Sequence, residues 1–192
     1  MQAVGLGLGD PFVVMRFVAW QAAHDRKHHG LDLATKRALV KEVEQYARVL
    51  ITCESPLPEE FERYGIAAPP ERIHDLLYYA TLLIGDSQTM TTEAAVLGTP
   101  AIRCNSFVGP SDMANFIELE REYGLIYSFR EPQEALNMSL ELLSQPDLNE
   151  QWARKRESML ECKIDVTQFI VDFIENYPES LRKYKEETKG QP

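Results

Sequence analysis

The stretch GDSQTMTTEAAVLGTP, which spans Gly85–Pro100, decides the fold of this chain. It follows the apolar run Leu82–Ile84, which predicts a short buried strand. A helix is expected over Thr89–Leu97, because Gly98 suits the left-handed cap of a helix and Pro100 cannot continue one. A buried strand that turns sharply into a helix is the unit from which parallel α/β sheets are built.

The turn between this strand and this helix is polar, with Ser87, Gln88 and Thr89 at the expected helix start. Free backbone N–H groups and the positive end of the helix dipole form a site for phosphate there. Glu93 lies one turn after Thr89 on the same helix face, where its carboxylate can accept hydrogen bonds from sugar hydroxyls. Phosphate and ribose together indicate a nucleotide. The alternative is structural, since Ser and Thr cap helices and Glu complements the helix dipole without a ligand.

Composition and charge are those of an ordinary globular protein. The chain has 192 residues, 44% of them hydrophobic and 26% charged, which suits one domain with a substantial core. Its net charge of −10 argues against nucleic acid and anionic membranes as partners, but an anionic small ligand is compatible with a local cleft. We find no apolar stretch of membrane-spanning length and no signal-peptide pattern. We therefore expect a cytoplasmic protein with reduced thiols at Cys53, Cys104 and Cys162.

Short apolar runs alternate with helical patterns along the chain. Strands are predicted at residues 12–18, 49–52, 66–67, 82–84, 101–104 and 125–127. Helices are predicted at residues 33–47, 58–64, 71–80, 89–97, 113–123, 132–143, 148–161 and 166–177. This alternation predicts an α/β, doubly wound, mainly parallel, Rossmann-like sheet in residues 11–178, followed by a solvated and frayed tail in residues 179–192. Ligands of such sheets bind beyond the carboxyl ends of the strands, here at the loops after Val18 and Ile84.

Three stretches carry a resemblance to a known family: Phe17–Asp25, Ile73–Ala80 and Gly85–Pro100. From Phe12 to Tyr177 the chain resembles domain-of-unknown-function family 354. This prokaryotic group is predicted to consist of GT-B-type glycosyltransferases and is similar to UDP-N-acetylglucosamine 2-epimerase. The resemblance implies a Rossmann-like lobe equivalent to the C-terminal lobe of a GT-B protein, which holds the nucleotide sugar.

The same resemblance implies roles for the turn residues. Ser87, Gln88 and Thr89 would cradle the diphosphate of a UDP-linked sugar, and Glu93 would hold the ribose. The related epimerases carry a glycine pair where this chain has Gln88 and Thr89. Glycosyl transfer and epimerisation both need groups from a facing lobe, so we expect weak or no activity from this chain by itself. The alternatives are an epimerase-like or hydrolase-like lobe and a non-catalytic binding or oligomerisation module.

Further candidate site residues lie in or near the strand-end loops. Arg16 is near the carboxyl end of the first strand, where it would neutralise the leaving diphosphate or else form a structural ion pair. His24 and Asp25 are candidates for a catalytic base or for donors to substrate hydroxyls. His74 begins a helix, where it would contact a base or phosphate or serve only the helix end.

Other side chains of these loops give weaker signals. His24, His28 and His29 are close enough in sequence for a metal, but solvated histidine-rich loops are commoner than metal sites. We predict no metal and no cofactor. Trp20 and Phe107 would flank a base or sugar ring, or simply cover the edge of the core.

The last predicted helix carries a broad apolar stripe. Apolar residues recur at helical spacing from Val166 to Tyr177. The stripe packs either on the chain's own sheet or on a partner, and the candidate partners are a second copy of the chain and a separate N-terminal lobe.

Overall fold

Five of the predicted apolar runs form one parallel sheet in a computed structural model, which describes residues 10–20, 28–66 and 69–189. The strand order is β2-β1-β3-β4-β5, so the direction in which strands are added reverses at β1, beside β3. The predicted doubly wound, parallel α/β fold is therefore confirmed. The strands are β1 Phe12–Phe17, β2 Arg48–Cys53, β3 Leu82–Gly85, β4 Ala101–Cys104 and β5 Ile126–Phe129. The remaining predicted strand, at residues 66–67, is not one of these five. Gly65, just before it, forms an isolated bridge with Ile51, and Ala67 lies outside the described residues.

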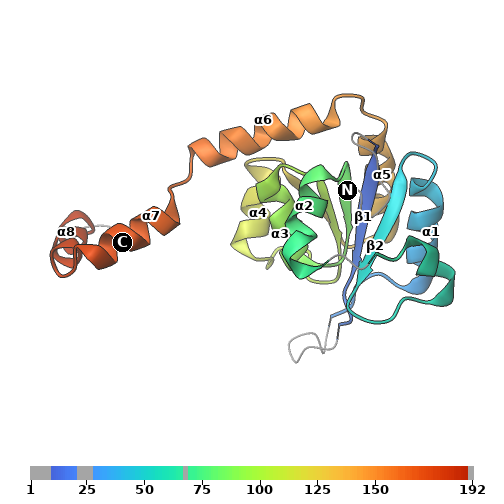
Figure 1. Cartoon of the computed structure of the whole chain (residues 1–192), viewed down its shortest axis with the longest axis horizontal. Coiled ribbons are helices and arrows are strands. Elements are labelled where there is room, and N and C mark those ends of the chain that lie inside the picture. The colour runs from blue at the N-terminus through green and yellow to red at the C-terminus, as the bar shows by residue number, and fades with distance from the viewer. Residues whose placement is uncertain (1–9, 21–27, 67–68, 190–192) are drawn as a thin grey trace. The chain divides into compact units, whose positions relative to one another are not determined.

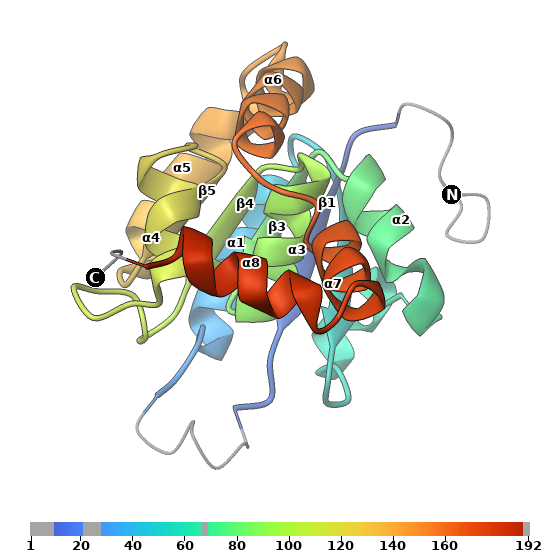
Figure 2. The same cartoon turned by 90° about the vertical axis from the view of Figure 1, so that its left-hand side faces the viewer.

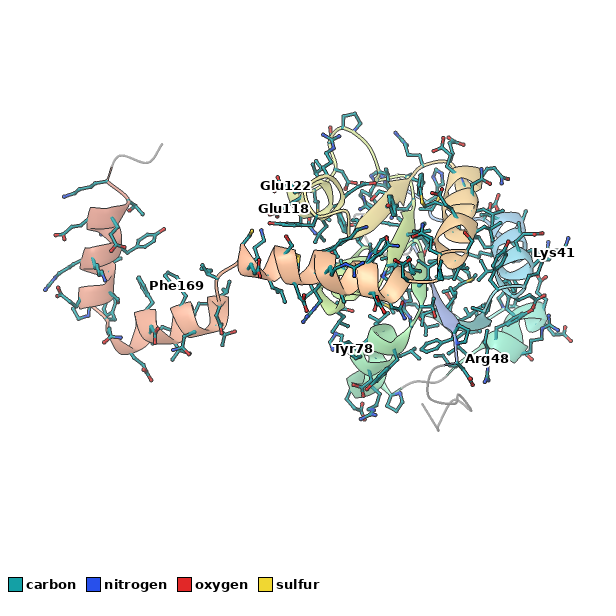
Figure 3. All side chains as sticks on the ribbon, turned by 90° about the horizontal axis from the view of Figure 1, so that it is seen from above. Lys41, Arg48, Tyr78, Glu118, Glu122 and Phe169 are labelled. Atoms are coloured by element: carbon teal, nitrogen blue, oxygen red, sulfur yellow. The ribbon has the colours of Figure 1, made fainter. Side chains whose placement is uncertain are left out.

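Helices cover both faces of this sheet. α2, α3 and α4 lie on one face, and α1 and α5 lie on the other (Figure 1). Charged side chains such as Lys41 on α1 and Glu122, the C-cap of α4, are exposed (Figure 3). The five helices are α1 Leu33–Val43, α2 Ile73–Tyr79, α3 Gln88–Leu97, α4 Ala114–Arg121 and α5 Pro132–Leu143.

Two predicted α-helices are wholly or partly 3₁₀-helical. Residues 59–64 form η3 Glu59–Tyr64, with hydrogen bonds that span three residues, such as the one from the Phe61 amide to the Pro58 carbonyl at 2.8 Å. Residues 70–72 form η4 Pro70–Arg72, which leads directly into α2. Both turns follow a proline. Proline has no N–H to donate in an α-helical turn, and short 3₁₀ turns suit such positions.

The core is built on strands that are buried on both faces. Phe12, Val13, Val14 and Met15 of β1 are all 0% exposed, although alternate side chains of a strand point to opposite faces. A parallel sheet covered by helices on both sides requires this continuous apolar pattern. At the start of α6 Leu148–Glu161, the indole of Trp152 is buried and its Nε1 donates to the Leu125 carbonyl at 2.8 Å.

The structure divides into two compact units, residues 1–157 with the sheet and residues 158–192. In the second unit, Ser180 Oγ donates to the Phe173 carbonyl at 2.6 Å, and the rings of Phe173 and Tyr184 meet edge to face at 6.2 Å. These contacts join α7 Val166–Glu175 to α8 Glu179–Glu187, which Figure 2 shows as adjoining helices. The predicted domain boundary at residue 178 stays a prediction.

The helices of the second unit expose most of their side chains. α7 has no buried residue, and Phe169, labelled in Figure 3, is 46% exposed. Packing of this apolar stripe on a partner stays a prediction. α8 forms where we expect a frayed tail, with Glu179 in its first turn and Lys185 in its last turn, the charges that complement a helix dipole. No helix among the described residues is long and apolar enough to cross a membrane.

Candidate functional site

A cleft of about 600 Å³ opens at the carboxyl edge of the sheet. It is lined by the ends of β1 and β2, by residues just before and at the start of α2, and by the first turns of α3. Four predicted site residues line this cleft together: Arg16, Ser87, Thr89 and Glu93. The strand order reverses here, which is where doubly wound sheets bind their ligands.

The amino end of α3 is prepared for an anion. Ser87 is the N-cap, and its hydroxyl accepts from the Met90 amide at 3.3 Å, so α3 begins at Gln88, one residue earlier than expected. Within the described part of the chain, the amides of Gln88 and Thr89 meet no acceptor. Thr89 is exposed and Gln88 is half-buried. The Thr89 amide at the cleft, the adjacent Gln88 amide and the helix dipole are thus available for a negatively charged group.

Gly85 allows the ends of β1 and β3 to approach each other beneath this cleft. A Cβ at residue 85 would lie 2.2 Å from the Arg16 carbonyl oxygen, a distance that no real side chain adopts. The same oxygen accepts from the Asp86 amide at 3.3 Å. Glycine is therefore required at this position by a close backbone approach.

Arg16 forms the ion pair that we considered as its structural role. Its guanidinium lies 2.8 Å from Glu54, and the other carboxylate oxygen of Glu54 accepts from the Ala19 amide at 3.2 Å. The Arg16 side chain is 21% exposed and still lines the cleft. Arg16 therefore combines a contact to the loop after β1 with a cation at the cleft wall.

His74 and Glu93 come together across two helices. His74 Nε2 on α2 lies 3.7 Å from Glu93 Oε1 on α3, and both side chains are accessible to solvent. His74 does not line the cleft itself. Glu93 itself lines the cleft, where its carboxylate can accept hydrogen bonds from a ligand.

The predicted catalytic pair, His24 and Asp25, lies outside the described residues. Its neighbour His28 stacks on Phe107 with ring centroids 3.6 Å apart, and His28 Nδ1 lies 3.1 Å from Ser106 Oγ. The described residues contain no group of three His, Cys, Asp or Glu side chains that could hold a metal ion.

Asp86 organises the carboxyl edge, a role that the sequence did not reveal. Its carboxylate is 1% exposed and accepts from the Val18 amide at 2.8 Å, Trp20 Nε1 at 3.0 Å and the Leu31 amide at 3.2 Å. Burial raises the pKa of Asp86 above its ordinary value, although the hydrogen bonds from Trp20 and Val18 oppose that rise. One carboxylate thus joins the loop after β1 and the segment before α1 to the turn that begins α3.

Close packing and backbone geometry fix the position of the Asp86 side chain and its neighbours. A Cβ on Gly30 would lie 2.0 Å from the Asp86 carboxylate. Asn105 Nδ2, in the loop after β4, donates to the Asp86 carbonyl at 3.1 Å. Trp20 has a φ of +54°, a strained value for a bulky residue, and its ring lies 5.9 Å from that of Phe107. An Asp that directly follows a buried strand is the signal that sequence reasoning could have used.

These features define a Rossmann-like lobe with a cleft at the switch in its strand order. The chain belongs to the family described as Protein of unknown function (DUF354), whose model matches residues 8–179. No curated protein matches the sequence.

Solved structures with similar folds are GT-B glycosyltransferases. The spinosyn forosaminyltransferase SpnP is 16% identical with a TM-score of 0.55, and the match covers 88% of this chain and 44% of SpnP. The calicheamicin glycosyltransferase CalG4 is 15% identical with a TM-score of 0.54, covering 88% and 44%. A variant of the wall teichoic acid polymerase TagF is 17% identical with a TM-score of 0.52, covering 95% and 47%. The chain spans less than half the length of each, and its fold is similar to that of a part of each.

Proposed function

We propose that this chain is the nucleotide-sugar-binding lobe of a GT-B-type glycosyltransferase and that its ligand is a UDP-linked sugar. The observation that carries the proposal is the cleft that brings Arg16, Ser87, Thr89 and Glu93 together at the strand switch. The similarity of the fold to the spinosyn forosaminyltransferase SpnP and to the calicheamicin glycosyltransferase CalG4 supports it.

Each group has a role that follows from its chemistry. The amides of Gln88 and Thr89 would donate to the diphosphate, and Arg16 would supply the positive charge that favours its departure. The carboxylate of Glu93 would accept from the ribose hydroxyls, with His74 Nε2 lying 3.7 Å from it. His24 and Asp25 stay candidates for the catalytic base. In this proposal the acceptor and the remaining catalytic groups come from a facing lobe.

A thermal-shift screen with UDP, UDP-N-acetylglucosamine, GDP, dTDP and ADP tests the proposal. At about 100 times Kd, a ligand stabilises the folded state by about 2.7 kcal/mol. For a domain of this size, that raises Tm by roughly 5–10 °C. We expect UDP and its sugar to give this shift, Glu93→Ala to abolish it and Glu62→Ala, an exposed carboxylate on η3, to retain it. The absence of a shift with every nucleotide would contradict the proposal.

Cysteine labelling locates the binding event. Cys53 is half-buried and lines the cleft, whereas Cys162 is exposed and lies outside it. Bound UDP should slow maleimide modification of Cys53 and leave the rate at Cys162 unchanged. Equal rates at Cys53 with and without saturating UDP would place the nucleotide elsewhere.

A further inference from the structure

Thr52, on β2, carries a buried hydroxyl for which the described part of the chain provides no hydrogen-bond partner. The residue is 7% exposed, and less than 1 Å² of its Oγ1 is accessible to water. Buried hydroxyls in native proteins are nearly always satisfied, because leaving one without a partner is destabilising. Arg103 Nε is the other such atom among the described side chains, and it belongs to a buried ion pair with Asp112.

Thr52 is one of the residues that line the cleft. It is the register partner of Arg16 in the neighbouring strand, so both side chains project from the same face of the sheet. Glu54, two residues further on, projects from this face as well, in agreement with its ion pair to Arg16. The Thr52 side chain therefore lies on the face of the sheet that lines the cleft, with its hydroxyl turned away from solvent. A change between staggered χ1 rotamers exchanges its position with that of the methyl group.

The surroundings of Thr52 differ from those of the anion site. Ile66, Pro70 and Ile73 give this end of the cleft apolar walls. β2 and β3 are separated by β1, so Thr52 stands about 10 Å across the sheet from the strand that leads into α3. A diphosphate fits the amino end of α3. The end of the cleft at Thr52, with apolar walls, one hydroxyl and the Arg16–Glu54 pair beside it, fits a flat heterocycle with a polar edge.

We propose that Thr52 is a specificity-determining residue that hydrogen-bonds the base of the bound nucleotide; the inference rests on the proposed function. The hydroxyl both donates and accepts, so it can satisfy a carbonyl or an N–H on the edge of the ring. The ring itself packs between the apolar residues at the start of α2. Ligand binding thereby supplies the partner that Thr52 lacks among the described residues.

Thr52→Val removes the hydroxyl and keeps the shape of the side chain. We expect it to weaken binding of UDP and uridine by about three- to tenfold, the contribution of one neutral hydrogen bond, and to leave pyrophosphate binding unchanged. Thr52→Ser keeps the hydroxyl and should bind UDP within about twofold of the wild type. Isothermal titration calorimetry with these three probes measures the affinities.

The Tm of the free protein is a second readout. Thr52→Val removes an unsatisfied group and should leave Tm unchanged or raise it. The matched control is Thr99→Val, because the buried Thr99 hydroxyl donates to the Leu77 carbonyl at 2.7 Å. This control should lower Tm and leave UDP affinity unchanged. A Tm for Thr52→Val as low as that of Thr99→Val would show that Thr52 has a structural partner, which overturns the inference.

The outcomes separate this inference from the proposed function. Failure of the wild-type chain to bind UDP overturns both. If the wild type binds UDP and Thr52→Val binds UDP equally well, the proposed function holds and the role of Thr52 is refuted. If Thr52→Val weakens pyrophosphate and UDP alike, the hydroxyl does not recognise the base, and the inference is likewise refuted.

Discussion

Replacing Gly85 with alanine tests the contact that joins β1 to β3 beneath the cleft. The added Cβ would lie 2.2 Å from the Arg16 carbonyl oxygen and 3.1 Å from the Arg16 backbone nitrogen and carbonyl carbon. All three are backbone atoms of a central strand, so no side-chain rotation relieves the overlap. The strands must separate locally by about 1 Å or more to restore an ordinary van der Waals distance.

The expected loss of stability follows from three contributions. Overpacking of a core costs about 1–3 kcal/mol. Separation of the strands also weakens the hydrogen bond from the Asp86 amide to the Arg16 carbonyl, at 3.3 Å, which adds about 1 kcal/mol. The smaller entropy of alanine in the unfolded chain offsets about 0.4–1 kcal/mol. We expect Gly85→Ala to lower the free energy of unfolding by about 1–4 kcal/mol.

Urea denaturation measures this change. With a slope of about 2 kcal/mol per molar urea, the midpoint should fall by about 0.5–2 M. Gly109→Ala is the matched control, because its Cβ would meet only the flexible end of Arg130, at 3.7 Å. Its free energy of unfolding should stay within about 0.5 kcal/mol of the wild type. Equal midpoints for the two variants would refute the argument that backbone approach demands glycine at residue 85.

Three further predictions concern buried groups. The pKa of Asp86 is raised in the folded protein, so the folded protein keeps the carboxyl proton at pH values where the unfolded chain has lost it. The contribution of Asp86 to stability therefore falls as the pH rises from the ordinary pKa of an aspartate to the pKa of Asp86 in the folded protein. Urea titrations should show the stability advantage of the wild type over Asp86→Asn shrinking across that window, and a growing advantage would contradict the sign. Asp112→Ala leaves the buried Arg103 guanidinium without its carboxylate and should cost about 3–5 kcal/mol in the same assay, and an unchanged midpoint would argue against the pair. Burial raises the pKa of Cys104 to about 11, so its thiol should react slowly with maleimide in the folded protein. Mass spectrometry after maleimide treatment should find the exposed Cys162 modified and Cys104 intact, whereas both should react in urea.

The sheet could be predicted from the sequence because buried parallel strands are continuous apolar runs. Leu82–Ile84 needed no alternation of polar and apolar residues to be recognised. The bounds of α5, Pro132–Leu143, agree with prediction because a proline suits the first position of a helix. The 3₁₀ turns differ from prediction because a short apolar-periodic segment contains no sign of whether its hydrogen bonds span three residues or four.

The candidate site could be predicted only where its residues are neighbours in sequence. Ser87, Thr89 and Glu93 share one helix, and their meeting follows from helical geometry. The partners of Asp86 lie far away in the chain, with Val18 separated from it by 68 residues. The missing partner of Thr52 depends on every element packed around it. Neither the hydrogen-bond partners of Asp86 nor the unsatisfied hydroxyl of Thr52 follows from a local sequence pattern.

The hydrogen bond between Trp20 and Asp86 couples the fluorescence of Trp20 to the cleft. The chain has two tryptophans, and Trp152 is 1% exposed, within the core at the start of α6. The Trp20 indole donates directly to the carboxylate of the residue that precedes Ser87, the N-cap of α3. A charge arriving at that helix end changes the electric field at one indole and leaves the other unaffected. In a Trp152→Phe background, the emission of Trp20 then reports occupancy of the cleft without a label.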